Sequence, residues 1–96
     1  MARYLVRMLD SVSGNEGTYS FEHREDLMKA PADEIVGAFF EYADREIFGR
    51  GHVVYELNGV VKNAKQKTVV AIGQMHKEGE EDAEDMQPFT IFISQG

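Results

Sequence analysis

The densest group of chemically capable side chains lies in the segment HKEGEEDAEDMQPF, residues 76–89. Carboxylate oxygens are the ligands that Ca²⁺ and Mg²⁺ prefer. An EF-hand loop needs acids at alternate positions, a glycine at the sixth and a glutamate at the twelfth, and this segment lacks that spacing. We interpret it as a solvated acidic loop, with a surface for a basic partner and a weak cation site as alternatives. The six acids are Glu78, Glu80, Glu81, Asp82, Glu84 and Asp85.

The three histidines, His23, His52 and His76, are the other candidate metal ligands. They are separated by 29 and 24 residues, so no pair has the helical spacing of an HExxH motif. Zinc usually takes three or four protein ligands, and the chain has no cysteine to supply them. We therefore expect neither a metal site nor a cofactor.

The chain has residue types that could serve in acid–base or nucleophilic catalysis, but they do not occur in the spacing of a known catalytic motif. His23 lies beside Glu22 and near Asp26, yet neighbours on a strand point to opposite faces. No serine sits in a G-x-S-x-G elbow. We expect a non-enzymatic protein. The alternative is a small enzyme or metal-binding protein, which should gather histidines and carboxylates in one cleft.

Composition and charge narrow the class of protein. The chain has 96 residues, 43% of them apolar, as expected for a single domain over residues 1–96. Its net charge is −7, of which residues 77–86 carry −5 and the other 86 residues only −2. This balance disfavours a nucleic-acid partner. The one feature that favours such a partner is a cluster of lysines, Lys62, Lys65 and Lys67. No run approaches the 18 apolar residues of a membrane span, so we expect a cytoplasmic protein without membrane contact.

The elements that must position these residues follow from hydrophobic periodicity. An amphipathic helix with apolar residues at helical spacing is predicted with Pro31 in its first turn, and Gly49 is suited to end it. Asn58-Gly59 is a strong tight-turn signal, but we favour one long strand with a bulge at Gly59 and a turn at residues 63–66. The predicted strands are residues 3–9, 18–25, 52–62, 68–75 and 88–94. The order ββαβββ predicts an α+β fold, an antiparallel sheet with the helix packed on one face.

Several predicted strands are apolar on both sides of the pleat. A single helix covers only one face of a sheet, so the second face needs another cover. Large exposed apolar patches mark interaction sites, and a strand edge can add a partner strand. We predict a protein-interaction or adaptor module that acts through a sheet face or an edge strand, with a protein partner or a second copy as its ligand. The candidate contact residues are Val54, Tyr55 and Phe92.

Overall fold

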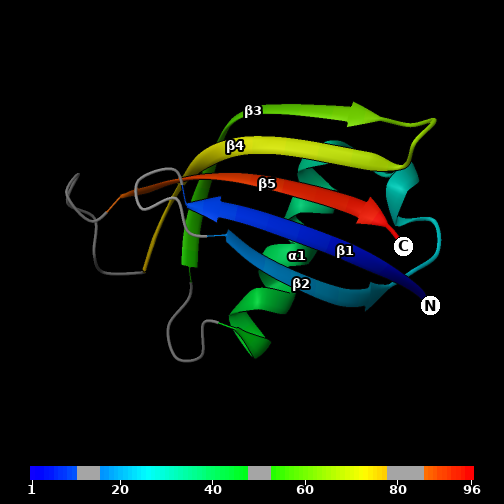
Figure 1. Cartoon of the computed structure of the whole chain (residues 1–96), viewed down its shortest axis with the longest axis horizontal. Helices are drawn as coiled ribbons and strands as arrows, with labels where there is room; N and C mark the ends of the chain where they lie inside the picture. The colour runs from blue at the N-terminus through cyan, green and yellow to red at the C-terminus, as the bar shows by residue number, and fades with distance from the viewer. Residues whose placement is uncertain (11–15, 48–52, 78–85) are drawn as a thin grey trace.

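The computed structural model describes residues 1–10, 16–47, 53–77 and 86–96 (Figure 1). Its elements are β1 (Ala2–Asp10), β2 (Glu16–His23), the 3-10 helix η1 (Leu27–Lys29), α1 (Ala32–Glu46), β3 (Val53–Asn63), β4 (Thr68–Lys77) and β5 (Gln87–Gln95). The predicted order ββαβββ is confirmed, and η1 is an addition that periodicity did not indicate.

The strands form one antiparallel sheet in the order β2-β1-β5-β4-β3. β5 therefore lies in the middle, although it follows every other strand along the chain. Figure 1 shows α1 crossing one face of this sheet, with no helix over the other face in the described part of the chain. The α+β fold is confirmed. The apolar sequence of β5 fits its position, because a central strand has no edge exposed to water.

Helix α1 begins where the sequence places its start signals. Pro31 sits at the N-cap with φ −56°, where its missing N–H leaves no donor unpaired. Asp33 and Glu34 lie in the first turn, at the positive end of the helix dipole. The predicted terminator Gly49 lies outside the described residues. No helix in the described ranges is long and apolar enough to cross a membrane.

Aromatic rings join α1 to the sheet. Phe40 stacks on Tyr55 of β3, with ring centroids 4.1 Å apart, and meets Phe39 and Phe89 edge-on at 5.5 Å. Phe39 is fully buried. Phe21 of β2 stacks in turn on two tyrosines. Aromatic pairs in these geometries stabilise a core beyond the area that they bury, and they fix how the helix lies on the sheet.

The β3–β4 hairpin resolves the two competing turn signals. β3 pairs with β4 from Val53 to Asn63, and the register shifts between Leu57 and Gly59. The predicted long strand with a bulge at Gly59 is confirmed, and no tight turn forms there. The chain reverses instead after Asn63, whose Oδ1 accepts a hydrogen bond from the Gln66 N–H at 3.1 Å.

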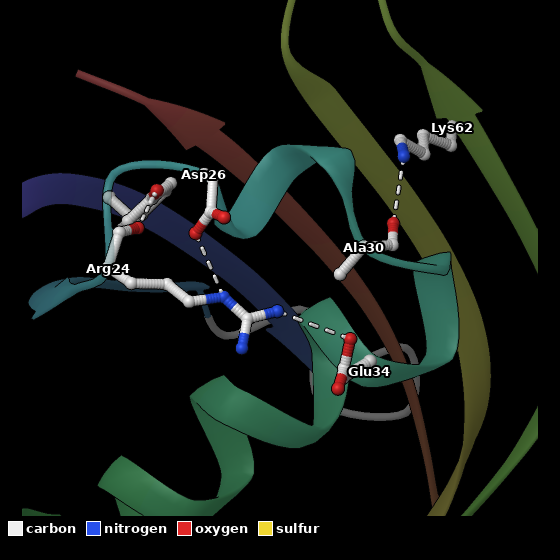
Figure 2. A network of polar contacts seen from close by, with 6 residues as sticks. Arg24, Asp26, Ala30, Glu34 and Lys62 are labelled. Atoms are coloured by element: carbon white, nitrogen blue, oxygen red, sulfur yellow. Dashed lines mark hydrogen bonds and ion pairs between the residues drawn. The ribbon is translucent and has the colours of Figure 1, made fainter.

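Polar contacts hold the segment around η1 between β2, α1 and β3 (Figure 2). The Arg24 guanidinium lies 3.1 Å from Asp26 Oδ1 and 3.4 Å from Glu34 Oε2. On the other side of η1, Lys62 Nζ donates a hydrogen bond to the Ala30 carbonyl at 2.8 Å. These contacts tie an irregular connection to α1 and to β3.

Candidate functional site

The sheet face opposite α1, called here the open face, carries a group of exposed apolar side chains. Alternation along each strand decides which side chains point there. Their inward neighbours, such as Val6, Ala71 and Ile91, are buried under α1. We call the group the Phe92 patch. It consists of Leu5 and Leu9 of β1, Val61 of β3, Val70 and Ile72 of β4 and Phe92 of β5.

The strand register places Phe92 at the centre of this patch. Phe92 lies directly opposite Val70 on one side and Arg7 on the other. Thr90, two residues before it, lies opposite Leu9 and Ile72, which makes these two side chains diagonal neighbours of Phe92. Direct neighbours are about 5 Å apart and diagonal ones about 7–8 Å. The patch is therefore one continuous surface.

The exposure of these side chains is substantial. Phe92 is 41% exposed, Ile72 51% and Val61 70%. Scattered surface hydrophobic residues are normal in proteins, but a contiguous cluster on regular elements is not. The open face thus exposes apolar area of the kind that a folded protein usually covers.

A charged pair frames one side of the patch. Arg7 Nε lies 2.8 Å from Glu16 Oε1, and both side chains are exposed. Together with Leu9, Thr90 and Phe92 they line a hollow of about 310 Å³. The same face therefore offers both apolar and charged side chains, as protein–protein contact surfaces do.

The three predicted contact residues are not brought together. Phe92 lies at the centre of the patch. Val54 is on the same face and 44% exposed, but it pairs with His76, four residues along β4 from Ile72, or about 13 Å away. Tyr55 lies on the opposite face, stacked on Phe40 beneath α1. Only Phe92 of the three belongs to the patch.

No known protein family, curated protein or solved structure matches this chain. The chemistry of the site therefore has to be argued from this chain's own residues.

Sequence reasoning did not name the other five members of the patch. Leu5 and Leu9 lie in the predicted strand at residues 3–9, and both are exposed. The predicted bulge at Gly59 bears on one of the five. Together with the pairing of Val61 with Val70, it puts Val61 on the open face.

The two histidines in the described ranges, His23 and His76, lie on opposite faces of the sheet. His23 lines a hollow of about 390 Å³ beside Glu34 and Glu41 of α1, and its buried Nδ1 has no hydrogen-bond partner. His76 lies on the open face, opposite Val54, and His52 is outside the described residues. Among the residues that the structure describes, no group of three or more possible ligands could hold a metal ion. Within this hollow, the enzyme alternative is left with one histidine and two carboxylates. Arg24 forms an ion pair with one of the two carboxylates.

Of the two charged segments singled out in the sequence, the structure describes only the one that carries the lysines. The acidic residues 78–85 lie outside the described residues, so their cation hypothesis stays a prediction. Of the predicted lysine cluster, Lys62 turns toward the helix side of the sheet and binds the Ala30 carbonyl. It does not join a basic surface at the hairpin tip.

Tyr55 gives the fold a testable dependence on pH. Burial raises the pKa of Tyr55 above its ordinary value, and the carboxylates of Asp33 and Asp44 add to the shift. An unfolded tyrosine loses its proton near pH 10. The native state therefore holds this proton more tightly than the unfolded chain, so its stabilising effect is complete below about pH 10 and is lost as the pH rises through the native pKa.

We expect the free energy of unfolding of the Tyr55→Phe variant to fall less steeply above about pH 10 than that of the unmodified chain. Urea unfolding across the alkaline range measures this difference. Tyr4, whose pKa burial also raises, remains in both proteins and supplies the residual slope. Identical pH profiles for the two proteins would show that Tyr55 does not contribute.

Proposed function

We propose that this protein is a non-enzymatic interaction module whose open face binds another protein surface. The observation that carries the proposal is the Phe92 patch, six contiguous apolar side chains on a regular sheet face that no described element covers. Covering apolar area releases about 25 cal/mol for each Å² removed from water. A second protein surface is the ligand best able to cover side chains spread over four strands.

The chemistry of the face favours protein over nucleic acid. Nucleic-acid sites neutralise phosphates with several lysines or arginines. The described strands bring Arg3 and Arg7 to the open face, together with Glu16, Glu22 and Glu56. This mixture has no positive excess, so the face as a whole does not attract phosphate.

The face is a better candidate than the edge strand β3. Edge strands that avoid pairing with other chains often carry bulges and inward-pointing charges. β3 has both, the bulge between Leu57 and Gly59 and the inward-pointing Lys62. The β3 edge is thus protected against pairing with a strand of another chain, while the Phe92 patch is left exposed.

The proposal is tested by photo-crosslinking in cells that produce the full chain. A photoreactive phenylalanine analogue replaces Ile72 on the open face or, as a control, Arg45 on the solvent side of α1. We expect protein adducts from position 72 and none from position 45. A second substitution, Val70→Lys, should abolish the adducts, because it places a charge in the contact. Equal adducts from both positions, no adducts from position 72, or adducts that survive Val70→Lys would overturn the proposal.

A further inference from the structure

We infer that the partner of the open face is a second copy of this chain, packed face to face about a two-fold axis. The inference rests on the proposed function and names its ligand. Three features of the described residues carry it: the size of the face, its charge, and the position of β5.

The open face has the size that a stable dimer needs. The sheet has five strands, and β1 and β5 are nine residues long. With strands about 4.8 Å apart and a rise of about 3.4 Å per residue, the face measures roughly 24 by 30 Å, or on the order of 700 Å². A standard interface takes about 800 Å² from each partner. Two such faces therefore form a contact of ordinary size without any further element.

The charge of the face suits a copy of itself. The chain carries −7 in total. The charged side chains that the structure describes on the open face are two arginines and three glutamates. Arg7 and Glu16 already neutralise each other within one copy. The described strands of the face thus carry a net charge of only −1, so the face requires no oppositely charged partner. Salt should strengthen this contact or leave it unchanged, because it screens the remaining repulsion between the two chains.

The central position of β5 decides which residues meet. β5 has two strands on each side, so a two-fold axis through the centre of the face brings the β5 strands of the two copies together. Phe92 would then pack near the partner subunit's Phe92, with the two sheets about 10 Å apart. Such an isologous contact closes on itself and gives a dimer, not a filament.

Sedimentation equilibrium of the purified full chain, from low micromolar to millimolar concentration, tests this inference. We expect a dimer, and we expect Phe92→Lys to weaken it at least about a hundredfold, since each interface would bury two unpaired charges. The matched control is Val60→Lys. Val60 is 39% exposed, close to the 41% of Phe92, but it lies opposite Ala71 on the helix side of the edge strand β3. This variant should remain dimeric.

Each other outcome decides against the inference. A chain that stays monomeric at millimolar concentration would exclude the second copy as the partner. In that case, adducts between the photoreactive analogue at position 72 and a different protein would still support the proposed function. A dimer that survives Phe92→Lys but not Val60→Lys would place the contact at the β3 edge. A dimer that dissociates as salt is raised would contradict an apolar contact. If Phe92→Lys fails to fold, as judged by circular dichroism, Ile72→Lys replaces it, with the same loss expected.

Discussion

Replacing Phe40 with alanine is expected to lower the free energy of unfolding by about 3–5 kcal/mol. Phe40 is 2% exposed, and its ring contacts Tyr55, Phe39 and Phe89. The substitution removes the ring that joins α1 to β3 and β5 and leaves a cavity that its aromatic neighbours can fill only in part. Domains of this size are typically stable by about 5–15 kcal/mol, so the variant should be close to its unfolding threshold. Urea unfolding followed by circular dichroism measures the loss.

The matched control is the same substitution at Phe92. Its ring is 41% exposed on the open face, so Phe92→Ala removes less buried area and opens no enclosed cavity. We expect a loss of roughly 1 kcal/mol in the free energy of unfolding, measured at a concentration where the chain is monomeric. Equal losses at Phe40 and Phe92 would contradict the assignment of one face as core and the other as open.

Replacing Gly73 with valine is expected to cost about 3 kcal/mol or more. Gly73 of β4 lies opposite Leu57, at the start of the bulge. A Cβ atom there would collide with the backbone carbonyl oxygen of Glu56 and lie 3.1 Å from the Phe89 ring. The backbone of β3 cannot move away without breaking its pairing with β4, so the collision cannot be relieved by a side-chain rotation. Thermal unfolding should show a large drop in Tm.

Gly59, on the other side of the same bulge, provides the control. A Cβ atom there would meet only the Ile72 side chain at 3.4 Å, an ordinary contact. We expect Gly59→Ala to change the free energy of unfolding by less than about 1 kcal/mol. If Gly59→Ala were as damaging as Gly73→Val, the requirement for glycine would come from the bulge in general, and not from the close approach of Gly73 to β3.

Local patterns predicted the elements of this fold well. The alternation in residues 18–25 matched β2, which ends at His23, and the helical spacing from Ile35 to Ile47 matched α1, which ends at Glu46, because these periodicities reflect one buried face. The bulge at Gly59 was predictable because a tight turn there would have left too short a strand before the polar tip at residues 63–67. These are constraints that act between residues close in the sequence.

Long-range arrangement was not predictable in the same way. Nothing in the sequence of β5 indicates that it pairs with β1, whose Tyr4 lies opposite Gln95. The 3-10 helix η1 was missed because three residues are too few to show a period. Its position depends on contacts from distant elements, including Lys62 of β3.

The sequence predicted an uncovered sheet face, but it did not predict which residues form the patch on it. Apolar residues on both sides of several strands correctly indicated a face that the single helix leaves uncovered. Val54 and Tyr55 are consecutive strand residues and so point to opposite faces, and the sequence did not show which of the two faces α1 would cover. In the structure it is the face of Tyr55, whose ring stacks on Phe40.

The strand order has a consequence for how the chain folds during synthesis. The β1–β2 and β3–β4 hairpins are each made of neighbouring strands and can form soon after they leave the ribosome. Within the sheet, β5 joins them by pairing with β1 and β4 at once. Until β5 has emerged, the facing edges of β1 and β4 lack the strand that pairs with both. Such edges recruit other chains, so the fate of the newly made protein depends on the interval between the synthesis of β4 and that of β5.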